Sequence, residues 1–92
     1  MTAIFISYSW SDSTQAQRIA ESLVRQGYWV WIDYQNLNLK QPLAPQLARA
    51  IWQTDLFLCV DSSHSRSSPW VQFELLLARI WDKSIRMIYL PN

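Results

Sequence analysis

Four short apolar runs without helical periodicity divide the chain, at residues 3–8, 28–32, 55–61 and 84–90. Polar residues, glycine or proline bound these runs, as is typical of buried strands. The second run is apolar on both of its alternating faces, which indicates a strand of a parallel sheet that is covered on both sides. We therefore predict four β-strands.

Between these runs, apolar residues recur with the spacing of a single buried helical face. The faces of the first two predicted helices are formed by Ala16, Ile19, Ala20, Leu23 and Val24, and by Ala44, Leu47, Ala48, Ile51 and Trp52. The face of the third predicted helix is formed by Trp70, Phe73, Leu77, Ile80 and Trp81. The segment before the third helix, residues 62–68, is rich in serine, and we expect a solvated loop there.

Capping residues mark the ends of the first predicted helix. Asp12 or Ser13 can cap its start, and Gln15 follows Asp12 at the spacing of a capping box. Gly27, the only glycine in the chain, fits the left-handed position that ends a helix.

Prolines mark the other two helix starts. Pro42 and Pro45 flank the start of the second helix, and Ser68 followed by Pro69 is an N-cap with proline at the first helical position. The predicted order is βαβαβαβ, which implies an α/β fold with a parallel sheet, right-handed crossovers and helices on both faces. Ligand sites in such sheets lie at the carboxyl ends of the strands.

Composition fits one small globular domain over residues 1–92. Of these residues, 50% are hydrophobic and 16% are charged, which is enough apolar material for a core. The net charge is +1 and the basic residues are scattered, so we expect no nucleic-acid partner. No signal peptide or membrane-spanning run is apparent, so we expect a cytoplasmic protein without a membrane partner. Cys59 is the only cysteine, and its apolar neighbours predict a buried thiol.

Several motifs with known chemistry are weak or missing. A single glycine excludes the dinucleotide-binding turn and the P-loop. His64 lies among the serines, but nothing resembles a nucleophile elbow, so serine-hydrolase chemistry is not favoured. Asp61 stands where a receiver domain carries its phosphate-accepting aspartate. Receiver chemistry also needs an acidic pair after the first strand, where only Asp12 is present, and Asp12 is better explained as a helix cap.

Trp70 and Glu74 lie four residues apart and share one face of the third predicted helix, close to its N-terminus and to the strand ends. Trp70 lies on the predicted apolar stripe, and Glu74 lies beside it. From spacing alone, the simplest interpretation is a core tryptophan next to a solvent-facing glutamate, because single carboxylates on helices are common.

Three stretches have an order and spacing that together are fairly specific. Residues 5–8 read Phe-Ile-Ser-Tyr and precede Ser-Trp-Ser-Asp, and residues 27–33 read Gly-Tyr-Trp-Val-Trp-Ile-Asp. Residues 55–63 are followed by Ser68, Trp70 and Glu74. Together they resemble the first box, the second strand with the start of the BB loop, and the Ser-x-Trp-x-x-x-Glu signature of a TIR (Toll/interleukin-1 receptor) domain, in particular the bacterial kind.

The resemblance implies a flavodoxin-like fold, with strand order 2-1-3-4 for the four predicted strands. Members of this family act as homotypic assembly modules, and many also cleave NAD+ with the glutamate of the signature as the catalytic residue. Glu74 occupies that position, so the resemblance implies a catalytic role for it. Cleavage of the nicotinamide–ribose bond builds positive charge on the sugar, which a nearby carboxylate can stabilise.

The resemblance also suggests which residues bind the substrate NAD+. They are Ser7, Tyr8, Trp10, Asp33, Lys40, Ser68 and Trp70. Trp10 either stacks on a ring of the ligand or is a surface side chain, and Trp70 either lines the pocket or supports the helix. No cofactor and no metal are expected.

Three departures from the family pattern bear on these expectations. Lys40 stands roughly where active relatives carry a glycine in the BB loop, which governs both assembly and access to the pocket. Val71 replaces the common cysteine of the signature. The chain stops after four predicted strands, so we expect a domain that lacks the usual C-terminal strand and helix, and an uncovered edge favours association.

These features predict a TIR-type signalling module that cleaves NAD+ when it self-assembles, in immune or anti-phage defence. The alternative is a non-catalytic scaffold that associates with itself or with other TIR domains through the BB loop, residues 33–46, and its helices. A receiver-like phosphoacceptor domain comes third.

Overall fold

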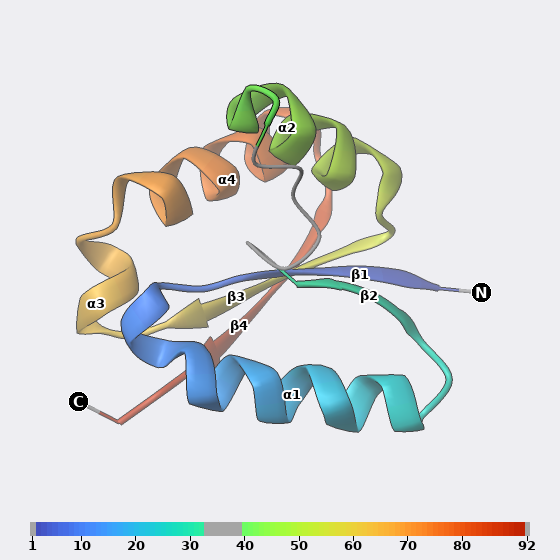
Figure 1. Cartoon of the computed structure of the whole chain (residues 1–92), viewed down its shortest axis with the longest axis vertical. Coiled ribbons are helices and arrows are strands. Elements are labelled where there is room, and N and C mark those ends of the chain that lie inside the picture. Colours follow the sequence, from blue (N-terminus) through green and yellow to red (C-terminus); the bar gives the residue numbers. More distant parts are fainter. Residues whose placement is uncertain (1, 33–39, 92) are drawn as a thin grey trace.

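A computed structural model describes residues 2–32 and 40–91. One parallel sheet contains β1 (Ala3–Ser7), β2 (Trp29–Ile32), β3 (Leu56–Asp61) and β4 (Ser84–Tyr89), in the order β2-β1-β3-β4. The helices are η1 (Trp10–Asp12), α1 (Ser13–Arg25), α2 (Leu43–Gln53), α3 (Ser63–Arg66) and α4 (Pro69–Ile80). Helix α1 covers one face of the sheet, and α2 and α4 cover the other (Figure 1). The predicted flavodoxin-like α/β fold and its strand order are confirmed.

Each face of the sheet has its own hydrophobic cluster, because successive side chains of a strand point to opposite faces. Ile4 and Ile6 of β1 belong to the cluster on the α1 side, whereas Phe5 belongs to the cluster under α2 and α4. Phe5 is in register with Phe57 of β3, and their rings stack with centroids 5.6 Å apart. This stack joins the two central strands beneath α2 and α4.

The two ends of α1 differ in how well the sequence predicts them. Gly27 follows the helix with φ +96°, which confirms it as the left-handed stop. Asp12 occupies the N-cap position, but its side chain makes no capping hydrogen bond. The predicted cap at Asp12, with Gln15 completing a box, is therefore wrong. The carboxylate of Asp12 instead accepts a hydrogen bond from Ser62, at the end of β3.

Two predictions about exposure and local structure also fail. Trp29 of β2 is half exposed, because β2 lies at the edge of the sheet rather than inside it. Residues 62–68 are not simply a solvated loop, since four of them form the short helix α3. Ser62 caps this helix and Ser65 completes a capping box, and both side chains are buried.

The buried face of α4 is rotated from the predicted stripe. Its buried residues are Val71, Glu74, Leu75 and Ala78. The large side chains of the predicted stripe form a half-buried rim, and Ile80 is exposed. The expectation that Glu74 lies beside the stripe and faces solvent is wrong. Val71, Leu75 and Ala78 form the face of α4 that packs on the sheet, and Glu74 lies on this same face. Within the described ranges, no helix is long and apolar enough to cross a membrane.

Candidate active site

Local sequence fixes where α4 begins, and so where Glu74 lies. Ser68 is the N-cap, and its hydroxyl accepts a hydrogen bond from the Val71 amide at 3.3 Å. Pro69 takes the first helical position, where no amide donor is needed. Glu74 then lies in the second turn, on the side that faces the sheet.

Ser7, the last residue of β1, donates a hydrogen bond from its hydroxyl to Glu74 Oε1 at 2.7 Å. Both residues have 0% solvent exposure. Burial of a carboxylate is unfavourable unless polar groups satisfy it, and a hydrogen bond to an ionised group is among the stronger ones. This contact fixes a carboxylate at the carboxyl end of a central strand, where parallel sheets place their ligand sites.

The pKa of the Cys59 thiol reflects its burial and also the negative charge of Glu74. Cys59 lies on β3 in register with Ser7. The pKa of the Cys59 thiol is raised to about 11, chiefly by burial and also by the negative charges of Asp61 and Glu74, while Arg79 opposes the rise. The thiol is therefore protonated at neutral pH, and the predicted buried cysteine is confirmed. A protonated thiol is a poor nucleophile, so Cys59 is not a candidate for nucleophilic chemistry in this part of the core.

Trp70 packs against the core and also lines a hollow on the surface. Its ring packs half-buried against the core cluster under α2 and α4, and it meets Phe73 edge-on with centroids 5.9 Å apart. Trp70 and Phe73 also line an apolar hollow of about 310 Å³ together with Ala44 and Pro69. The tryptophan therefore supports α4 and also presents an aromatic surface at the start of the helix that carries Glu74.

The structure does not gather all the predicted substrate-binding residues around Glu74. Tyr8 is buried in the cluster on the α1 side, on the opposite face of the sheet from α4. Trp10 is 67% exposed in η1, and Lys40 is exposed before α2. Asp33 lies outside the described residues. Ser7, in contrast, contacts Glu74 directly through its hydroxyl.

Sequence reasoning missed a second group of buried polar residues. Asp12, Ser62 and Ser65 are all buried, and they join the turn after β1 to the turn after β3. The three-residue spacing of Ser62 and Ser65 was the available signal, since a capping box needs that spacing. The partner Asp12 is 50 residues away, which no local pattern reveals.

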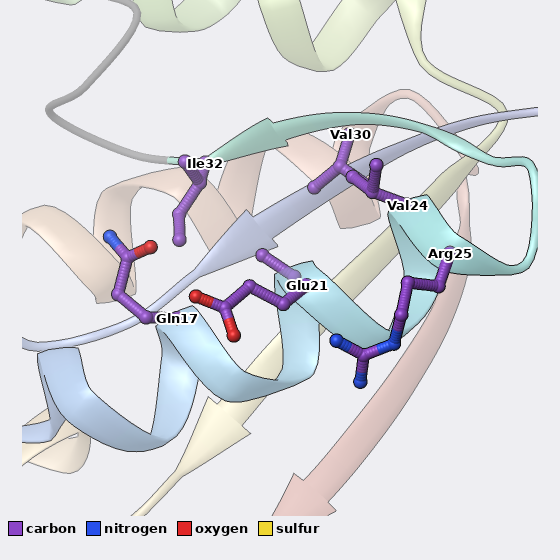
Figure 2. Close-up of a pocket in the computed structure, with 7 residues that line it drawn as sticks. Gln17, Glu21, Val24, Arg25, Val30 and Ile32 are labelled. Carbon is purple, nitrogen blue, oxygen red and sulfur yellow. The ribbon is translucent and has the colours of Figure 1, made fainter.

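Another hollow lies between α1 and the edge strand β2 (Figure 2). It has a volume of about 450 Å³ and is lined by Val24, Val30 and Ile32 with the polar side chains of Gln17, Glu21 and Arg25. It lies on the α1 side of the sheet, so Glu74 does not contribute to it.

The described residues do not support the receiver-like alternative. Arg66 pairs with the carboxylate of Asp61 at 2.7 Å, which occupies the predicted phosphoacceptor. Across residues 2–32 and 40–91, no three acidic, histidine or cysteine side chains lie close enough to hold a metal ion.

Comparisons with solved structures bear on the fold. The TIR domain of the Toll-related receptor TRR-2 from Hydra magnipapillata superposes with a TM-score of 0.87 at 16% identity, over 97% of this chain and 71% of that chain. The TIR domains of the activated Roq1 resistosome give 0.82 at 18% identity, over 97% of this chain and 57% of that chain. The CMP N-glycosidase BcmB of Clostridium botulinum gives 0.69 at 19% identity, over 96% and 71%.

A comparison with protein-family models bears on the family itself. None of the curated proteins compared with the chain matches it. The TIR domain model, in contrast, matches residues 4–91, which contain all the described strands and helices except Ala3, the first residue of β1. The chain belongs to the TIR domain family.

Proposed function

We propose that this TIR domain is a signalling module that cleaves NAD+ at the nicotinamide–ribose bond when it self-assembles, with Glu74 as the catalytic carboxylate. The observation that carries the proposal is the buried hydrogen bond between Ser7 and Glu74 at the carboxyl end of the sheet. Burial of a carboxylate lowers the stability of a fold unless polar partners compensate for it. A fully buried carboxylate is therefore typical of a functional site.

The chemistry needs little beyond such a carboxylate. The bond between ribose C1′ and the pyridinium nitrogen breaks, and its electron pair neutralises the nitrogen, so nicotinamide leaves as a neutral ring. Glu74 stabilises the positive charge that develops on the ribose, and water then adds to C1′ with loss of a proton to give ADP-ribose. The N-glycosidase among the structurally similar proteins supports the view that this fold can host N-glycosidic bond cleavage.

The complete burial of Glu74 is the reason to tie activity to assembly. NAD+ cannot reach a carboxylate with 0% exposure, so the reaction requires the packing around Ser7 and Glu74 to open. Self-association through residues 33–46 and the neighbouring helices can supply the free energy for that opening. We further propose a role in immune or anti-phage defence and a cytoplasmic location.

Nicotinamide release from NAD+ tests the proposal. We expect turnover by concentrated wild-type protein, with a specific rate that rises with protein concentration. Glu74→Gln keeps the size of the side chain but removes its charge, and we expect kcat to fall about 10²–10³-fold. Glu21→Gln, an exposed carboxylate on α1, is the matched control and should behave as wild type. Equal turnover by wild type and Glu74→Gln would overturn the catalytic role.

A non-catalytic scaffold is the second candidate, and exposed side chains on α4 favour it. Leu76 and Ile80 lie one turn apart and are 55% and 64% exposed. Exposed apolar pairs on a helix suit protein–protein contacts. Concentration-dependent oligomers in sedimentation velocity, without nicotinamide release at any concentration, would support the scaffold over the enzyme.

A further inference from the structure

A second buried carboxylate lies at the carboxyl end of the sheet, and the proposed reaction does not use it. Asp12 ends η1 and is only 4% exposed. Its Oδ2 accepts a hydrogen bond from the hydroxyl of Ser62, which directly follows β3. This contact ties the start of α1 to the start of α3, and α3 lies beside the η1 turn that leads into α1 in Figure 1. Aspartate is rarely so buried without a specific partner, and Ser62 supplies one.

Asp12 determines how the Ser62 hydroxyl is oriented. A hydroxyl has one proton to donate and two lone pairs that accept. Ser62 donates its proton to Asp12, which leaves the lone pairs for the amide of Ser65 at 3.1 Å. The Ser62 amide in turn donates to the Ser65 hydroxyl at 2.8 Å. By fixing the orientation of the Ser62 hydroxyl, the Asp12 carboxylate therefore stabilises the capping box at the start of α3.

The same network continues into α4. The carbonyl oxygen of Ser65 accepts hydrogen bonds from the Ser68 amide and from the Gln72 side chain, each at 3.1 Å. Ser68 is the N-cap of α4, and Gln72 lies in its first turn, two residues before Glu74. One carbonyl of α3 therefore holds both the cap and the first turn of the helix that carries the proposed catalytic residue.

We propose that Asp12 is a positioning residue for Glu74 and acts through Ser62, Ser65 and Gln72, a set that we call the Asp12 relay. This inference rests on the proposed catalytic role of Glu74. An apolar contact of the same shape would stabilise the α1–α3 junction as well as or better than a buried carboxylate does. A chain of directional hydrogen bonds, in contrast, fixes the rotation and height of the first turn of α4, and catalysis depends on such precise placement.

Amide hydrogen exchange and the NMR signal of the Glu74 carboxyl carbon test the relay without any need for activity. In Asp12→Ala, we expect amides of residues 62–72 to exchange about tenfold faster, because their local opening costs less free energy. The Glu74 carbon signal, assigned by its loss in Glu74→Gln, should shift. Asp12→Asn should remain close to wild type, because its amide oxygen can still accept from Ser62.

Asp55 offers the matched control. Its carboxylate accepts a hydrogen bond from the Ala3 amide at 2.8 Å, and so joins the starts of β1 and β3 at the opposite end of the sheet. Asp55→Ala should leave exchange in residues 62–72 and the Glu74 signal unchanged. The proposal is overturned if Asp12→Ala matches wild type in both readouts, or if Asp55→Ala changes them equally. Should Asp12→Ala fail to fold, Ser62→Ala and the hydroxyl-bearing Ser62→Thr provide the same comparison.

Kinetics separate positioning from general destabilisation. We expect Asp12→Ala to lower kcat for nicotinamide release about tenfold, while KM changes less than about twofold and Asp12→Asn restores most of the rate. An equal loss of kcat in Asp55→Ala would overturn the positioning role. If wild type does not cleave NAD+ at all, the proposed function fails, whereas the exchange and carbon-signal readouts still decide whether Asp12 positions α4.

Discussion

The hydroxyl of Ser7 and the carboxylate of Glu74 meet at 2.7 Å, although 67 residues separate them in the chain. The contact joins the last residue of a central strand to the second turn of α4. Its formation therefore requires the sheet and the helix to be packed together, so the site exists only in the folded domain.

Removal of the Ser7 hydroxyl should destabilise the fold. Ser7→Ala leaves Glu74 buried without this donor, and we expect the free energy of unfolding to fall by about 1–3 kcal/mol. Urea denaturation monitored by circular dichroism measures the change. Ser67 is the control, because its hydroxyl donates to the Ser63 carbonyl at an exposed position, and Ser67→Ala should change stability by less than about 0.5 kcal/mol.

The stacked phenylalanines should dominate the stability of the face under α2 and α4. Phe57 is completely buried, so Phe57→Ala should cost about 3–5 kcal/mol through lost burial and the cavity that remains. Leu76→Ala, on the exposed side of α4, should cost less than about 1 kcal/mol in the same denaturation experiment. Similar losses for the two variants would contradict the core described above.

Gly27 should tolerate substitution poorly for backbone reasons alone. Its φ of +96° disfavours any residue with a Cβ, although a Cβ added there meets nothing within 4 Å. Gly27→Ala should therefore lower stability by about 1–2 kcal/mol, and Gly27→Asn by less, because asparagine enters this region more readily. Equal thermal midpoints for wild type and both variants would show that the turn has another conformation.

The pKa of Cys59 predicts a pH dependence at the alkaline end. The thiol has its ordinary pKa of 9.0 when unfolded and about 11 when folded, so stability is unaffected below pH 9. As pH rises from 9 to 11, the unfolded state loses the proton first, and stability falls by up to about 1.4 kcal/mol per pH unit. In Cys59→Ala, the free energy of unfolding measured by urea denaturation should not show this additional fall between pH 9 and 11. Parallel pH profiles for the two proteins would contradict the shift.

Local signals predicted the end of α1 and the start of α4 correctly. Gly27 and the Ser68–Pro69 pair each act through their own backbone, so both could be recognised without knowledge of the rest of the chain. The strand order followed from the family resemblance and the alternation of strands and helices. What the sequence could not reveal was the rotation of α4 about its own axis, because that depends on how its side chains fit the sheet.

In the candidate site, too, the sequence indicated individual residues but not the tertiary contacts between them. Ser7 and Glu74 were both identified from the motifs, but their hydrogen bond is a tertiary contact and could not be foreseen from spacing. Asp12 was interpreted as a helix cap because its position fits one. Packing overrode that local preference when Ser62, 50 residues away, provided a buried partner.

The burial of Glu74 also has an evolutionary consequence. At the centre of the inward face of α4, between Val71 and Ala78, leucine or methionine would pack at least as well as a carboxylate. Drift in a relative that no longer needs the reaction would therefore tend to replace the glutamate with an aliphatic residue. Among relatives with this fold, the residue type at this one position would then distinguish lineages that retain the chemistry from lineages that retain only assembly.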